Sequence, residues 1–170
     1  EIARSFDCEL MKVAAPPRGT SPGDSVARLR AVCEAAGDDL TVVFENTPGS
    51  TWDTGEACDR VLRALADERN VGFAFNPAHF ANVGEKPFLG TWRATKLKHR
   101  TRIIYATDGC FPGRPDYTLP LQGNGEVKEI ISIFRARSYD GFVTLKMGDR
   151  RGTDEFKRQA AAFRRLLETS

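Results

Sequence analysis

The sequence predicts an α/β fold in which short parallel β-strands alternate with α-helices. The prediction depends first on five apolar, β-branched runs, at residues 8–13, 40–46, 71–76, 102–107 and 141–146. Counted from start to start, they lie 32, 31, 31 and 39 residues apart, with helical patterns between them. Apolar runs of this length between helices are typical of buried parallel strands. Polar side chains follow the runs, and in such folds the carboxyl ends of the strands carry the functional residues.

The composition is that of an ordinary globular protein. Of the 170 residues, 41% are hydrophobic and 28% are charged, so we expect one domain over residues 1–170 with its own core. The net charge is only +2 and the basic residues are scattered, so the sequence predicts neither a nucleic acid nor a membrane surface as partner. No apolar run approaches the roughly 18 residues that a membrane helix needs.

The four cysteines show no CxxC spacing. Cys8, Cys33 and Cys58 occupy apolar positions of a predicted strand and two predicted helices, which indicates buried thiols. Cys110 lies in a loop and is the one candidate for a reactive thiol. Unpaired cysteines are typical of a reducing compartment, so we expect a cytoplasmic protein.

In the first half of the chain, two helices are predicted between strands. Residues 1–6 have the pattern of the end of a helix, and a proline-containing loop follows the first strand. The helix expected over residues 22–36 has one apolar face and ends at Gly37; the face comprises Val26, Leu29, Cys33 and Ala36. Thr54 is expected to cap the next helix, which carries Cys58, Val61, Leu62 and Leu65.

In the second half, the pattern is less regular. Residues 77–80 are expected to leave the third strand as a loop, and residues 87–99 are expected to be helical on a weak pattern of Leu89, Trp92 and Leu97. The long Gly- and Pro-rich loop at residues 108–125 is typical of a functional or flexible segment. A helix at residues 127–137 should bury Ile130, Ile131 and Phe134. Thr153 should cap a last helix that buries the stripe Phe156, Ala160, Phe163 and Leu167.

The five units can form either an open parallel sheet or part of a barrel. An open doubly wound sheet usually has a glycine-rich phosphate loop after its first strand, whereas Ala14-Ala15-Pro16-Pro17 occupies that place here. Five units cannot close an eight-stranded barrel. The nearly constant repeat therefore favours a partial TIM barrel of about five βα units.

Five short motifs at the strand ends add a resemblance that covers roughly 140 residues. They are Val43-Phe44-Glu45-Asn46; residues 71–79, Val-Gly-Phe-Ala-Phe-Asn-Pro-Ala-His; residues 102–108, Arg-Ile-Ile-Tyr-Ala-Thr-Asp; residues 121–127, Leu-Gln-Gly-Asn-Gly-Glu-Val; and residues 139–146, Tyr-Asp-Gly-Phe-Val-Thr-Leu-Lys. In this order they resemble the xylose isomerase-like family of TIM barrels, which includes sugar phosphate isomerases/epimerases and endonuclease IV-type enzymes. The resemblance implies the C-terminal part of a barrel, with about three N-terminal units absent. We therefore expect an oligomer or association with the missing barrel portion.

The resemblance also implies four metal-ligand positions. The family's isomerases hold one divalent cation with Glu, Asp, His and Glu, where this chain has Glu45, Asn76, Tyr105 and Lys146. His79 matches the histidine that follows the second ligand. Three of the four ligand types have changed and one position is now cationic. We therefore expect no metal and no other cofactor, with a Glu45–Lys146 ion pair in place of the cation.

The candidate site residues divide into two groups. The catalytic candidates are Glu45, His79 and Lys146, and the substrate-binding candidates are Asn46, Asn76, Tyr105, Asp108 and Trp52. Five of them also have a structural interpretation. Glu45 either binds ligand or forms an ion pair, and His79 either transfers a proton or holds a loop. Tyr105 and Trp52 either face a ligand or pack in the core, and Asp108 either binds ligand or bonds its own loop.

Three functions follow from these residues and the resemblance. The first is a sugar or sugar phosphate isomerase/epimerase-like protein with a degenerate metal site, inactive as an enzyme or serving as a carbohydrate-binding scaffold. The second is a metal-independent acid–base enzyme that acts on a keto-sugar or related carbonyl compound. The third is a subunit that completes its barrel with another chain.

Overall fold

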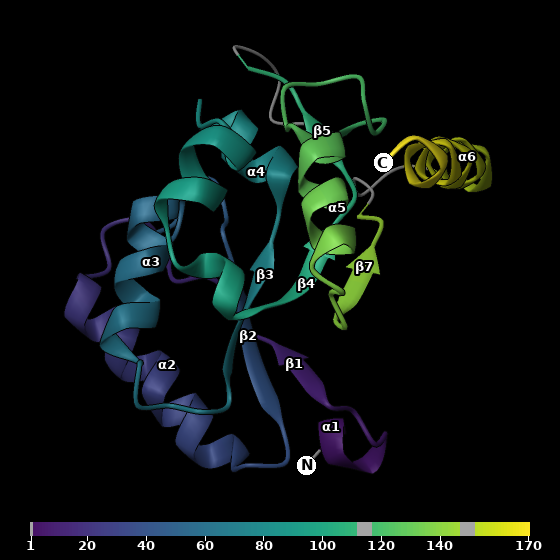
Figure 1. Ribbon diagram of the computed structural model, residues 1–170. Helices are drawn as coiled ribbons and strands as arrows, with labels where there is room; N and C mark the ends of the chain where they lie inside the picture. Colours follow the sequence, from purple (N-terminus) through teal and green to yellow (C-terminus); the bar gives the residue numbers. More distant parts are fainter. Residues whose placement is uncertain (1, 112–116, 147–151) are drawn as a thin grey trace.

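The computed structural model describes residues 2–111, 117–146 and 152–170 (Figure 1). The elements in chain order are α1 (Ile2–Ser5), β1 (Leu10–Lys12), α2 (Pro22–Ala36), β2 (Thr41–Glu45), α3 (Gly55–Ala64), β3 (Val71–Phe75), α4 (Pro77–Asn82), the π-helix η1 (Pro87–Trp92), the 3₁₀ helix η2 (Leu97–His99), β4 (Thr101–Tyr105), β5 (Asp108–Gly109), β6 (Tyr117–Thr118), α5 (Val127–Ala136), β7 (Phe142–Thr144) and α6 (Thr153–Thr169). None of the helices in these described ranges is long and apolar enough to cross a bilayer.

The main sheet has five strands in the order β1-β2-β3-β4-β7, and every pairing is parallel. The order is that of the sequence, as the spacing of the five apolar runs predicts. The sheet is curled, and α2, α3 and α5 lie along its outer side (Figure 1). The fold is an α/β partial TIM barrel, which confirms the predicted fold class.

The hydrophobic core lies between the sheet and the outer helices, because alternate strand residues point to opposite faces. Phe44 and Phe73 point outward from adjacent strands, with ring centroids 5.1 Å apart. Trp52 packs edge-on against Phe44 at 4.9 Å. Phe44 and Phe73 are fully buried, and burying an aromatic side chain of this kind contributes about 2–3 kcal/mol. The outward aromatic residues therefore fix the sheet against its helices and leave the inner face to Glu45 and its neighbours.

Two local expectations for residues 77–99 need correction. Residues 77–82 form α4 rather than a loop, because Pro77 starts the helix and the Asn76 side chain caps it by accepting from the His79 backbone N–H. The helix expected over residues 87–99 is divided into two elements, η1 and η2, with residues 93–96 between them. The Glu126 carboxylate accepts from the backbone N–H groups of Phe88 and Leu89 at 2.7 and 3.1 Å, so a distant side chain holds the first turn of η1.

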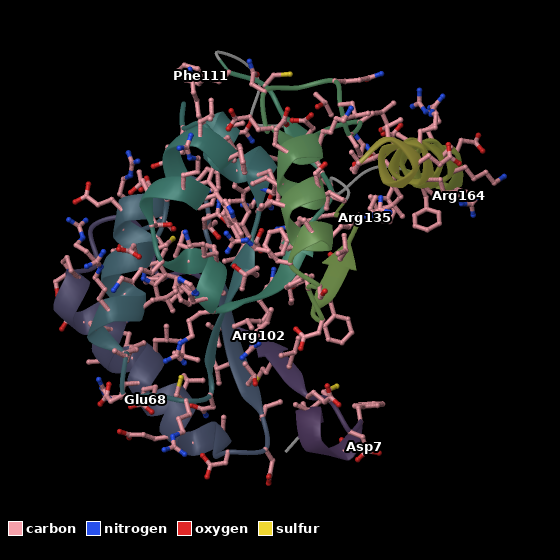
Figure 2. All side chains as sticks on the ribbon, viewed as in Figure 1. Asp7, Glu68, Arg102, Phe111, Arg135 and Arg164 are labelled. Atoms are coloured by element: carbon pink, nitrogen blue, oxygen red, sulfur yellow. The ribbon has the colours of Figure 1, made fainter. Side chains whose placement is uncertain are left out.

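The last helix buries a different face from the one expected. Its buried residues are Glu155, Gln159, Ala162 and Leu166, whereas Phe156 is 52% exposed and Leu167 39%. Arg135 of α5, labelled in Figure 2, donates to the carbonyl oxygens of Leu167 and Ser170 at 2.6 and 2.7 Å. These contacts belong to the tertiary structure, which the apolar period of α6 alone does not reveal. Gly152, not Thr153, is the N-cap residue.

Two further expectations concern Cys8 and the long loop. Cys8 is exposed rather than buried, because β1 begins only at Leu10; Cys33 and Cys58 are buried as expected. Part of the loop at residues 108–125 falls on residues 112–116, which lie outside the described residues. On either side of that gap, β5 and β6 pair antiparallel.

Candidate functional site

Glu45 is the centre of a polar cluster at the carboxyl ends of the strands. Its side chain is only 3% exposed. Lys12 Nζ donates to Oε2 at 2.7 Å, and Lys146 Nζ lies 2.8 Å from Oε1 and 3.1 Å from Oε2. Asn76 Nδ2 donates to Oε1 at 2.7 Å. Two ammonium groups and one amide, from three other strands or their ends, thus converge on one carboxylate.

The charge of Glu45 follows from these contacts. Burial alone would raise the pKa of Glu45, but the hydrogen bonds from Asn76, Lys12 and Lys146 outweigh it and hold the pKa below the ordinary value of 4.5. The carboxylate is therefore ionised at neutral pH and has little tendency to accept a proton. This weakens the case for Glu45 as a general base.

His79 is held by the strand end that carries Glu45. Its Nδ1 lies 2.6 Å from the Asn46 carbonyl oxygen and 3.2 Å from Glu45 Oε1. Because a carbonyl can only accept, the hydrogen bond assigns a proton to Nδ1 and, in the neutral ring, the lone pair to Nε2. Burial lowers the pKa of His79, although Glu45 and the Asn46 carbonyl partly oppose the shift. A neutral imidazole with its lone pair on Nε2 is the form that a general base requires.

The two asparagines connect adjacent strand ends. Asn46 Nδ2 donates to the Asn76 carbonyl at 2.9 Å, and Asn46 Oδ1 accepts from the Asn76 backbone N–H at 2.9 Å. Both residues are fully buried. Asn46 therefore fixes the position of Asn76, which in turn orients the Glu45 carboxylate.

Tyr105 forms an aromatic wall beside the two lysines. Its ring centroid lies 5.3 Å from Lys146 Nζ and 5.9 Å from Lys12 Nζ, within cation–π range. Tyr105 is only 8% exposed, and burial raises its pKa, assisted by the charge of Glu45. The phenol is therefore protonated at neutral pH.

Lys12 is the residue that the sequence analysis missed. It ends β1 and pairs in register with Val43, two residues before Glu45 on the same face of the neighbouring strand. A signal was present, since Lys12 is a long cationic side chain near the end of an otherwise mostly apolar run. The register that directs it toward Glu45 becomes visible only in the structure.

Asp108 and Trp52 are placed away from this cluster. The Asp108 carboxylate accepts from the backbone N–H groups of Gly109, Gly123 and Gly125 at 2.9, 3.0 and 2.7 Å, so it holds the ends of its own loop together. Burial raises the pKa of Asp108 against these hydrogen bonds. Trp52 is 3% exposed on the outer side of the sheet, where it borders a cavity of about 330 Å³ between α2 and α3. Their substrate-binding roles stay predictions.

Comparison with known proteins identifies the family. A family model described as xylose isomerase-like TIM barrel matches residues 1–168. The chain belongs to this family. No curated protein sequence matches the chain.

Solved structures of the xylose isomerase-like type share the fold at low identity. A probable 3-DHS dehydratase, AsbF, from Bacillus anthracis has a TM-score of 0.76 at 18% identity, over 98% of this chain and 66% of that one. A D-tagatose 3-epimerase-like protein has a TM-score of 0.75 at 21% identity, over 98% of this chain and 64% of that one. A xylose isomerase-like TIM barrel protein from Mycobacterium smegmatis, in complex with magnesium, has a TM-score of 0.69 at 12% identity, over 99% of this chain and 64% of that one. The chain thus spans slightly less than two thirds of each of these three structures.

Four side chains occupy the positions at which the resemblance implies metal ligands. They are one carboxylate, an amide that donates to it, a protonated phenol and an ammonium, at Glu45, Asn76, Tyr105 and Lys146. Within residues 2–111, 117–146 and 152–170, no group of three or more His, Cys, Asp or Glu side chains is arranged to hold a metal ion.

Proposed function

We propose that this chain is a sugar isomerase/epimerase-like barrel protein whose Glu45 site binds a sugar or sugar phosphate without a metal ion. The observation that carries the proposal is the engagement of both Glu45 oxygens by ammonium groups at 2.7–3.1 Å. The two lysines supply the positive charge that, on the resemblance, a divalent cation supplies in the family's isomerases. In this reading the chain is a carbohydrate-binding pseudoenzyme that has lost metal chemistry.

The residues at this site do not fit a divalent cation. At about 4 Å and an effective dielectric near 20, two unit charges of like sign repel by about 4 kcal/mol, and a divalent ion doubles that figure. Lys146 would impose this repulsion directly, and Lys12 would add to it. The neutral groups of Asn76 and Tyr105 cannot offset it, since hard cations prefer charged oxygen ligands.

The ligand proposal is tested by thermal shift with a panel of sugars and sugar phosphates. We expect a stabilising ligand whose dissociation constant rises at least about tenfold in Glu45→Gln, because the variant loses the charge that positions both lysines. The matched control is Glu56→Gln on α3, whose side chain is 81% exposed and forms an ion pair with Arg60. Ligands that bind both variants equally well would place the binding site elsewhere.

A second candidate is a metal-independent acid–base enzyme, favoured by the tautomer of His79. Isomerisation of a keto-sugar needs a base that removes the proton next to the carbonyl and a cation that stabilises the resulting enediolate. The imidazole of His79, which burial keeps neutral by lowering its pKa, is the base for the first role, and the ammonium groups of Lys12 and Lys146 have the charge for the second. The low pKa of Glu45 makes His79 the better base.

This candidate predicts base-dependent exchange of substrate protons. In D₂O, wild-type protein should incorporate deuterium next to the carbonyl of a bound ketose, and His79→Gln should slow the incorporation by about 10²-fold or more. The control is His99→Gln, since His99 is exposed and outside the cluster. Equal exchange rates in the two variants would show that His79 is not the base. If no bound ketose exchanged its protons, the result would favour the proposal that the chain is a pseudoenzyme.

The partner proposal is association through exposed strand edges. β1 and β7 are the outer strands of the sheet, and Phe142 of β7 is 55% exposed. The apolar stripe of α6 adds Phe156, which is 52% exposed. We expect these surfaces to contact a second copy or further barrel units. Sedimentation should reveal association that Phe156→Ser weakens, and a stable monomer at high concentration would contradict the partner proposal.

A cytoplasmic location stays a prediction, supported by four free thiols.

A further inference from the structure

We infer that Lys12 and Lys146 form an anion-binding pair, so that the ligand of the Glu45 site carries a carboxylate or phosphate group. The inference rests on the proposed function, because it concerns the ligand of the same site. It adds Lys12 as a binding residue and assigns a charge to the ligand.

The exposure of the side chains decides which charge an incoming ligand meets first. The side chains of Lys12 and Lys146 are 40% and 29% exposed, whereas that of Glu45 is 3% exposed. The carboxylate is therefore buried behind its two cationic partners. A ligand that enters the site approaches ammonium groups rather than the carboxylate.

The net charge of the cluster also favours an anionic ligand. Among the described residues it contains two ammonium groups and one carboxylate, so one positive charge is left in excess. Tyr105 is neutral, and His79 is neutral because burial lowers its pKa. The Asp108 carboxylate does not cancel the excess, since it is 1% exposed and directed to the backbone of its own loop, away from the cluster. One ligand anion would balance the charge of these described groups.

The two ammonium groups are also fixed in position. Both contact Glu45, and both lie against the same Tyr105 ring, with Lys12 Nζ 5.9 Å and Lys146 Nζ 5.3 Å from its centroid. A lysine held in this way loses less rotamer freedom when a ligand binds than a mobile surface lysine does. Neighbouring ammonium groups at fixed positions suit the several oxygens of one carboxylate or phosphate, with charge-assisted hydrogen bonds.

The test compares matched ligands that differ in charge. Affinities of the 170-residue chain would be measured by calorimetry at low salt for D-glucose against D-glucuronate, for D-fructose against D-fructose 6-phosphate, and for inorganic phosphate alone. We expect at least one charged member to bind about tenfold or more tightly than its neutral partner, with an advantage that decreases as salt is added. The uronate and phosphate arms distinguish the two sources of the anion.

Three variants assign the effect to Lys12. Lys12→Met should remove the preference for the charged ligand, and Lys12→Arg should largely keep it. Lys128→Met, at an exposed position of α5, should change nothing. Circular dichroism and the melting temperature verify that each variant is folded, and Lys12→Arg keeps the charge should Lys12→Met fail to fold.

The outcomes separate this inference from the proposed function. Equal affinity for charged and neutral sugars, with both lost in Glu45→Gln, would overturn the anion pair and leave the sugar site standing. Binding of inorganic phosphate that depends on Lys12, without binding of any sugar, would support the anion pair and remove the sugar function. Absence of all anion binding, or anion binding that Lys12→Met leaves unchanged, would overturn the inference.

Discussion

Glu45→Ala is expected to lower the free energy of unfolding by about 2–4 kcal/mol, the largest stability effect of any single change in the site. Removing one partner of a buried ion pair typically costs about 3–5 kcal/mol, and partial exposure of Lys12 and Lys146 reduces that cost because water can solvate their ammonium groups. Asn76 would also lose the acceptor of its buried amide. Urea denaturation measures the difference, and Glu56→Ala on the exposed face of α3 should change stability by no more than about 0.5 kcal/mol.

Acid provides a second measurement of the same carboxylate. Because the pKa of Glu45 is lower in the folded protein than its ordinary value of 4.5, Glu45 stabilises the fold fully above that pH. The stabilisation is lost as the pH falls through the folded-state pKa. The gap in unfolding free energy between wild type and Glu45→Ala should therefore be constant near neutral pH and narrow below pH 4.5. A gap that widens in acid would contradict the assigned contacts.

The parallel order of the strands was predictable because each apolar run is short and bounded, and because its neighbours recur at nearly one spacing. The meeting of Glu45, Asn76 and Lys146 followed from the same reasoning, since carboxyl ends of parallel strands share one edge. The functional roles of these residues stay predictions. The structure adds the number of hydrogen bonds and ion pairs that the Glu45 carboxylate forms, because these depend on side-chain geometry.

Lys12, Trp52 and α6 show where sequence reasoning ends. The inward direction of Lys12 depends on the register of β1 against β2, and a shift of one residue would reverse it. The outward position of Trp52 depends on the path of a loop after β2. The face that α6 buries depends on Arg135 and on the position of α5. Each is a tertiary relation between segments, and no local pattern in any one segment encodes it.

Rebuilding the family's ligand set should create a metal site on the same strand ends. Wild-type protein is expected to retain no stoichiometric Mg²⁺, Mn²⁺ or Zn²⁺ after dialysis against a chelator. The triple variant Asn76→Asp, Tyr105→His and Lys146→Glu should bind Mn²⁺ weakly, because it provides three carboxylates and an imidazole with Glu45. Calorimetry with Mn²⁺ measures the gain.

Lys12 adds a second test of whether the lysines replace the cation. In the triple variant, its ammonium still lies against Glu45 Oε2 at the 2.7 Å contact of the wild type, unless the side chain moves away. Adding Lys12→Met should therefore tighten Mn²⁺ binding by about tenfold or more, since it removes a cation beside a dication. Lys12→Met alone, with the three ligand positions unchanged, is the control and should bind no Mn²⁺. Wild-type protein that retains one equivalent of metal, or a quadruple variant that binds no more tightly than the triple, would show that the lysines do not replace the cation.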